Sequence, residues 1–229
     1  MRNHKTYLLI PVLTALIASL NAQTINWVSL EDQYRHIVNA SFGAEYGMIY
    51  GLGYGYHIHT KLFEIVPVAE YSFPSGNKIF DDFKAKAGVQ IRWVEFHNFQ
   101  FSTRIQGIFR RGENDFVRLL NFGSDLAGVI GYYRPRWFVS GETGFDKAIV
   151  TNFKHSQKYR DQYPDVIDGW YEPSTGGNFY FGAQAGYSFK AHDIYLKAGT
   201  ILTQDFKTKP LLPFYLQLGY NFKFGEIDG

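Results

Sequence analysis

Two short histidine motifs are the first candidates for chemistry in this chain. His57 and His59 lie two residues apart, so on a strand both imidazoles would share one face, where they could bind a metal ion. The spacing shows no third ligand and the pair falls at an expected turn. The favoured interpretation is therefore two surface histidines, with no metal and no cofactor. His155 precedes Ser156, which would suit hydrolysis, but neighbours of this kind are common by chance and geometry decides a catalytic site.

A second candidate is the stretch 150–177, which has no sustained alternation and is predicted to be a long loop. Its rings stand beside carboxylates, a combination that suits sugar or protein surfaces because rings supply apolar area and polar tips supply direction. The residues expected to form this binding surface are Tyr159, Tyr163, Asp165, Asp168, Trp170 and Tyr171. The alternative is a loop that packs on itself.

Charged residues of both signs recur on one face of the expected strands, opposite the apolar side chains. They are Glu64, Glu70, Lys84, Lys86, Arg92, Arg104, Asp125, Glu142 and Lys197. A closed interior can hold unpaired charges only at a high cost in free energy, so these groups must pair or line water. The favoured interpretation is a plug of ion pairs, and the alternative is a narrow channel for small solutes.

The element around which the chain is organised is the last expected strand, at 212–224. One face of it carries Phe214, Leu216, Leu218, Tyr220, Phe222 and Phe224, as the period-two alternation of a strand dictates. Rings stand at both ends of this face and leucines stand between them. That order is typical of a strand that crosses a lipid bilayer, with aliphatic groups in the hydrocarbon and rings near the interfaces.

The same alternation recurs along the chain and predicts an all-β fold. The clear strands are expected at 45–58, 62–73, 83–93, 99–110, 120–132, 137–148, 178–190, 194–203 and 212–224. An even number brings both ends to one side, so 33–42 is predicted as the tenth strand, with eight or twelve strands as alternatives. Pro67 cannot donate to a ladder and predicts a bulge.

Connection lengths also alternate, as they do in transmembrane barrels. Short turns are expected at 59–61, 94–98, 134–136 and 190–193, and longer connections at 74–82, 111–118, 149–177 and 204–211. The alternative is a soluble, lipocalin-like barrel with the apolar face inside. Rings at strand ends, glycines on the opposite face and strands of about eleven residues oppose that alternative.

Residues 1–22 are predicted to be a secretory signal peptide. Arg2 and Lys5 precede an apolar run at 7–20, which is short for a helix that must span ~20 residues of hydrocarbon. Cleavage is expected after Ala22, leaving 23–229 as one domain, and the alternative is an uncleaved anchor. The chain has no cysteine, so disulfides play no part. Removing the leader leaves 21 basic and 21 acidic residues, which argues against a nucleic-acid partner.

The aromatic-rich strand near the C-terminus resembles the closing strand of bacterial outer-membrane β-barrel proteins, although residues 225–229 follow its last ring. The resemblance covers most of the chain after residue 22 and identifies no narrower family. It implies a closed antiparallel up-and-down transmembrane β-barrel in the bacterial outer membrane. Membrane lipid and lipopolysaccharide would surround it, and the barrel-assembly machinery would insert it as a monomer.

The favoured function is a structural or surface-binding role carried by the loops, with a surface protein or a glycan as the ligand. A narrow channel is one alternative. A lipid- or peptide-hydrolysing barrel that uses His155 is the other, although the motifs of lipid A deacylases and outer-membrane proteases are not matched. An enzyme is the less favoured class.

Overall fold

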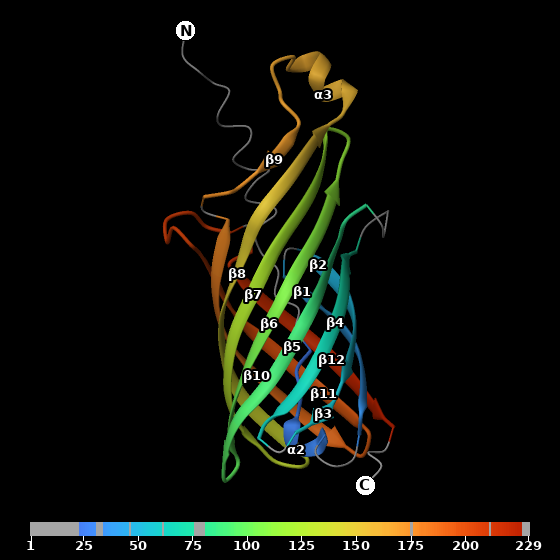
Figure 1. Ribbon diagram of the computed structural model, residues 1–229, viewed down its shortest axis with the longest axis vertical. Coiled ribbons are helices and arrows are strands. Elements are labelled where there is room, and N and C mark those ends of the chain that lie inside the picture. The colour runs from blue at the N-terminus through green and yellow to red at the C-terminus, as the bar shows by residue number, and fades with distance from the viewer. Residues whose placement is uncertain are drawn as a thin grey trace.

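Hydrogen bonds between neighbouring strands close the sheet of this protein on itself. The computed structural model describes residues 23–30, 34–45, 47–60, 62–75, 81–174, 176–210 and 212–225, and the predicted signal peptide at 1–22 lies outside them. The wall consists of β1 (His36–Ala44), β2 (Met48–Tyr56), β4 (Glu64–Pro74), β5 (Phe83–Phe96), β6 (Phe99–Glu113), β7 (Val117–Tyr133), β8 (Trp137–His155), β10 (Gly177–Phe189), β11 (His192–Thr203) and β12 (Phe214–Phe224). β1 pairs with β12 and β8 pairs with β10, which confirms a closed antiparallel barrel of ten strands (Figure 1).

Four short elements complete the described chain. β3 (Ile58–His59) extends β2, and β9 (Gly169–Tyr171) pairs with the end of β8. α2 (Trp27–Leu30) lies at the end with the short turns, and α3 (Gln157–Gln162) lies beyond the opposite end, above β7 and β8 (Figure 1). We call these ends the short-turn rim and the long-loop rim. Within the described ranges, no helix is long and apolar enough to cross a bilayer.

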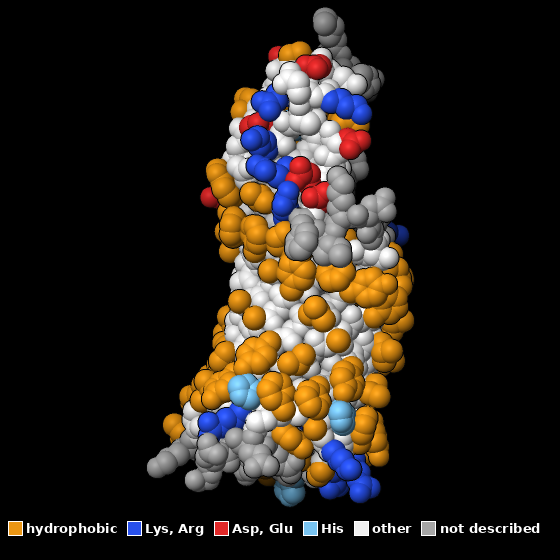
Figure 2. All heavy atoms as spheres, turned by 90° about the vertical axis from the view of Figure 1, so that its right-hand side faces the viewer, with side chains coloured by type: hydrophobic (Ala, Val, Ile, Leu, Met, Phe, Trp, Pro, Cys, Tyr) orange, Lys and Arg blue, Asp and Glu red, His pale blue; other side chains and the backbone are white. Residues whose placement is uncertain are grey.

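The outer surface of the barrel carries the apolar side chains. Leu52, Leu126 and Leu218 are among the exposed residues of the waist, and rings such as Tyr50 and Trp137 are exposed nearer the two ends. Figure 2 shows two belts of hydrophobic side chains on one face, with charged residues gathered above the upper belt. This arrangement is that of a barrel surrounded by lipid, in which a closed ladder satisfies every spanning backbone group.

Glycines on the inner face make room for large rings. A Cβ atom added to Gly219 would collide with the Tyr195 ring, and one added to Gly182 or Gly199 would collide with Tyr215. Tyr195 and Tyr215 are both almost fully buried inside the barrel. These three inward glycines are therefore positions at which interior rings approach the wall closely.

Residues 23–30, which we call the plug, fill the barrel at the short-turn rim. Trp27 and Leu30 are buried in a cluster with Ile37, Val66 and Tyr195 of the wall. Polar groups of the plug are bonded as well, because the backbone N–H of Gln23 donates to Glu70 Oε1 at 2.8 Å and the side-chain Nδ2 of Asn26 donates to Ser188 Oγ at 2.8 Å. The plug was not predicted from the sequence, because a helix as short as α2 shows no repeating pattern of apolar residues.

The prediction that 150–177 forms one long loop was wrong. β8 continues to His155, and the chain then forms α3 and β9. The register of β7 and β8 shifts here, because Phe122 pairs with Val150 while Gly123 pairs with Ala148. Because Ile149 is an extra residue, the positions after it in β8 face the opposite way from those before it. This change of face interrupts the alternation from which the strand would be predicted.

The bulge expected at Pro67 was also wrong. Pro67 pairs with Val89 in an unbroken register between β4 and β5. The interruption lies in the neighbouring strand instead, where His57 separates β2 from β3 and donates its amide hydrogen to the Arg35 carbonyl at 2.6 Å. Pro67 has no N–H to donate, so the ladder is interrupted on the side of β2 and β3, and β4 itself contains no extra residue.

We predict that replacing Leu126 with arginine destabilises the barrel by about 2–4 kcal/mol, because a charge then lies in the hydrocarbon at the waist. The measurement is reversible urea unfolding in phospholipid vesicles. The control is Gln162→Arg on the exposed surface of α3, which should change stability by less than about 0.5 kcal/mol. An equal effect of the two substitutions would contradict a lipid-facing waist.

Candidate functional site

The middle of the barrel is filled by ion pairs. Lys197 Nζ lies 2.8 Å from Glu142 Oε1, and the Tyr215 hydroxyl donates to the same oxygen at 2.6 Å. Lys86 Nζ lies 2.7 Å from Asp125 Oδ2. All five of these side chains are buried, and each charge lies beside a group of the opposite charge.

Buried rings connect these pairs into one network. Arg104 Nη2 donates to the Tyr180 hydroxyl at 2.9 Å, and that hydroxyl donates to Asp125 Oδ1 at 2.7 Å. Arg104 Nη1 also lies 3.7 Å from Glu142 Oε2. Each of these groups belongs to a different strand, so the network holds opposite sides of the wall at fixed separations.

Further pairs lie toward the two rims. Lys84 Nζ is 3.0 Å from Glu45 Oε1, and Arg110 Nη2 is 2.6 Å from Asp146 Oδ2. At the short-turn rim Arg92 Nη2 is 2.7 Å from Glu64 Oε1. The nine interior charges singled out from the sequence are all buried in the described structure.

One interior group missed from the sequence joins the plug to the wall. Lys223 Nζ lies 2.8 Å from Asp193 Oδ1 and donates to Ser29 Oγ at 2.6 Å. The Asn221 amide beside it donates to the Thr24 carbonyl at 2.7 Å. The inward position of Lys223 on the closing strand could have pointed to this contact, but its partner in the plug had no recognisable pattern.

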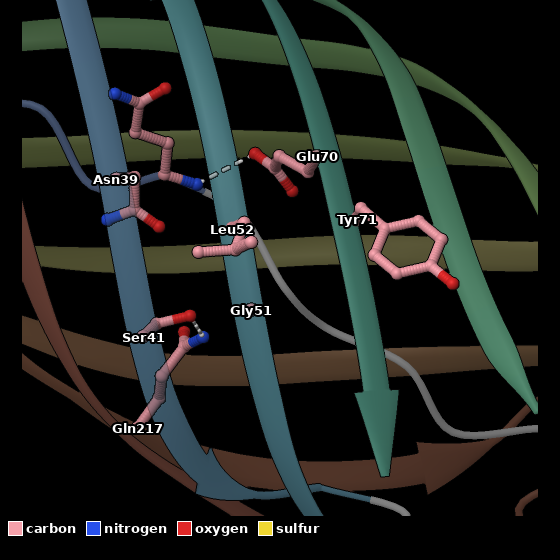
Figure 3. A pocket seen from close by; sticks show the side chains of 8 residues that line it. Asn39, Ser41, Gly51, Leu52, Glu70, Tyr71 and Gln217 are labelled. Carbon is pink, nitrogen blue, oxygen red and sulfur yellow. Dashed lines mark hydrogen bonds between the residues drawn. The ribbon is translucent and has the colours of Figure 1, made fainter. Parts of the chain in front are cut away.

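A small pocket lies between the plug and the wall. Asn39 and Ser41 from β1, Glu70 from β4 and Gln217 from β12 line it together with Gln23 (Figure 3). The Gln217 amide donates to Ser41 Oγ at 2.9 Å, and Glu70 accepts the Gln23 amide hydrogen. Side-chain hydrogen bonds therefore occupy much of the lining, and the pocket has little room for a ligand.

Beyond the long-loop rim, β7 and β8 extend into a hairpin that ends in α3 and β9. We call residues 153–171 the tip. Four of its rings form a continuous series, in which the centroids of Phe153 and His155 are 6.4 Å apart, those of His155 and Tyr159 5.1 Å, and those of Tyr159 and Tyr163 4.9 Å. Phe153 is buried against Val117 and Leu119. A small core thus packs the tip against the end of β7.

Asp168 clamps the two arms of the tip together. Its Oδ1 accepts the backbone amide hydrogen of His155 at 2.8 Å and lies 2.8 Å from His155 Nδ1, while Arg160 Nη1 lies 3.6 Å from Oδ2. Two contacts hold the pKa of Asp168 below its usual range. The hydrogen bond from the backbone N–H of His155 has the larger effect, and the hydrogen bond with the His155 ring adds to it. The clamp is therefore present at neutral pH and is lost as the pH falls through that lowered pKa.

The six tip residues selected from the sequence lie in different surroundings. Tyr163, Asp165 and Tyr171 are exposed, whereas Tyr159 is half-buried within the ring series. Asp168 belongs to the clamp. Trp170 is exposed, but its ring lies 6.0 Å from the outward ring of Phe122, so it extends the upper aromatic belt of the barrel. The most exposed apolar residue of the tip, Ile167 at 72%, was not selected.

The His155–Ser156 pair is not arranged for nucleophilic catalysis. The Ser156 hydroxyl donates to the Asp115 carbonyl at 2.8 Å and accepts the Tyr159 amide hydrogen as the N-cap of α3. The His155 ring is oriented by Asp168 and stacked on Tyr159. Both side chains therefore hold the tip in shape.

His57 and His59 lie at the short-turn rim, with His57 at the interruption between β2 and β3 and His59 within β3. His57 is buried, whereas His59 is exposed. Both rings approach the carboxylate of Glu64, at 3.4 Å from His57 Nε2 and 3.5 Å from His59 Nδ1. The structure thus brings together with the histidine pair a third group that the spacing did not reveal.

No protein-family model and no curated protein matches the chain. Among solved structures it is similar to the NanC porin (11% identity, TM-score 0.46, covering 82% of this chain and all of that one). It is also similar to the KdgM porin (10%, 0.41, 82% and 99%) and to the β domain of the Bordetella autotransporter BrkA (11%, 0.42, 84% and 100%). Because these identities and TM-scores are low, the function has to be argued from the residues of the chain.

We predict that Glu142→Ala destabilises the barrel by about 3–5 kcal/mol, because the buried Lys197 ammonium then loses the carboxylate that lies 2.8 Å from it. The measurement is again urea unfolding in vesicles. The comparison is Glu113→Ala, which breaks an exposed pair with Arg111 and should cost less than about 1 kcal/mol. Equal costs would show that water already solvates the interior pairs.

Proposed function

We propose that this chain, a small closed barrel of the outer-membrane type, serves as a rigid support that presents its tip as a binding surface outside the cell. Export by the signal peptide at 1–22 and residence as a monomer in the bacterial outer membrane are part of the proposal. The short-turn rim would face the periplasm and the long-loop rim the exterior, as is usual for such barrels. The observation that carries the proposal is the contrast between a filled interior and an exposed tip.

The interior argues against transport as the main role. The plug occupies the barrel at one end, and paired charges cross it in the middle. A ten-stranded barrel has little space to spare, unlike porins with sixteen or more strands. If the leader is removed after Ala22, the Gln23 nitrogen becomes a charged terminus, and its contact with Glu70 becomes an ion pair that further holds the plug.

The tip has the properties of a presented surface. The small core against β7 and the Asp168 clamp hold its shape, which lowers the entropic cost of binding. Tyr163, Ile167 and Tyr171 expose apolar area, and carboxylates such as Asp165 lie among them. Rings with neighbouring carboxylates suit a glycan or a protein surface, because the rings supply apolar area and the polar groups supply direction.

We expect the triple substitution of Tyr163, Ile167 and Tyr171 by alanine to abolish binding without affecting the barrel. The measurement is adhesion of cells that express the protein to surfaces coated with purified polysaccharides or proteins. Phe96→Ala, which removes an exposed ring near the opposite rim, is the control and should leave adhesion unchanged. Equal adhesion by wild type and the triple variant on every coating would overturn the proposal.

A further inference from the structure

Three potential metal ligands meet at the short-turn rim. β3 pairs with β4 so that His59 lies opposite Glu64, and His57 precedes β3. Their ligand atoms all lie within 4.8 Å of one another. Each histidine is about 3.4–3.5 Å from a Glu64 oxygen, and two atoms bonded to one tetrahedral zinc ion at 2.0–2.1 Å are separated by roughly 3.3–3.4 Å. The cluster therefore approaches the size of a zinc site.

The hydrogen bond at His57 Nδ1 determines the tautomer of the ring, and so whether the nitrogen that faces Glu64 has a free lone pair. His57 Nδ1 lies 3.2 Å from the Tyr34 carbonyl oxygen, which can only accept, so Nδ1 carries the proton. In the neutral ring Nε2 is then an acceptor, and it faces Glu64 Oε2. Both atoms are buried, they lie 3.4 Å apart, and within the described ranges neither makes a hydrogen bond to another group. A cation between two such acceptors would satisfy both, and metal-bound histidines commonly donate their other N–H to a backbone carbonyl.

The local charges leave room for a divalent cation. The Arg92 guanidinium lies 2.7 Å from Glu64 Oε1 and also 2.7 Å from Glu95 Oε2. Among the described residues it therefore lies between two carboxylates, which together carry one more charge than it does. Glu64 Oε2, the oxygen nearest to His57, is the oxygen that Arg92 does not occupy.

We propose that His57 Nε2, His59 Nδ1 and Glu64 bind a divalent ion of the zinc class. Two imidazoles and one carboxylate suit Zn²⁺ and also Cu²⁺ or Ni²⁺, but suit Mg²⁺ or Ca²⁺ poorly. The exposed side of His59 leaves a coordination position open to solvent at the rim. Because Tyr34 follows the plug in the chain and its carbonyl accepts from His57, a bound ion would also hold the plug in place.

The test uses the full mature protein in detergent, purified without a histidine tag and treated with a chelator. Zn²⁺ is titrated by calorimetry, and Co²⁺ is added separately to record the visible absorption of a tetrahedral site. We expect one ion per chain and a Co²⁺ spectrum typical of nitrogen and oxygen ligands. His59→Ala and Glu64→Gln should each weaken Zn²⁺ binding by about tenfold or more.

His97→Asn is the matched control, because His97 is an exposed histidine in the β5–β6 turn at the same rim. This variant should bind Zn²⁺ as the wild type does. Retained β-sheet circular dichroism in all variants would exclude misfolding as the cause of weakened binding. The proposal is overturned if wild type binds no Zn²⁺ or if His59→Ala binds Zn²⁺ as tightly as His97→Asn.

Discussion

The structure depends on the compensation of charge inside a narrow barrel. The closed ladder satisfies the backbone and lipid covers the outer face, so the inward side chains decide whether the wall encloses water or a solid core. Lys86 with Asp125, and Lys197 with Glu142, lie at ion-pair distance in buried surroundings. With Arg104 and the buried tyrosine hydroxyls, these pairs make the interior a polar core.

The polar core and the plug together explain why the molecule consists of a filled barrel and a projecting tip. Trp27 and Leu30 of the plug bury apolar groups at one rim, and Lys223 ties the same segment to the closing strand. A filled barrel resists deformation, so the hairpin of β7 and β8 projects from a rigid base. The tip lies beyond this base and carries exposed apolar side chains such as Tyr163 and Ile167.

Most of the wall could be predicted from the sequence, because alternation at period two assigns each side chain to one face. The alternation changes face where Ile149 adds a residue to β8. For this reason the sequence predicts a loop where the strand continues. The partners of the interior charges could not be predicted either, since Lys86 on β5 and Asp125 on β7 are separated by β6 and their contact depends on the register of three strands. Glu64 was named as an interior charge, but its meeting with His59 depends on the register of a short hairpin.

The measurement that tests the filled interior most directly is the electrical conductance of single wild-type molecules in a planar lipid bilayer. If the plug and the ion pairs close the barrel, inserted protein gives no current steps, while removal of residues 23–30 produces them. Stable current steps from the intact wild-type protein would contradict this account, because ions would then be crossing a space assigned here to paired side chains.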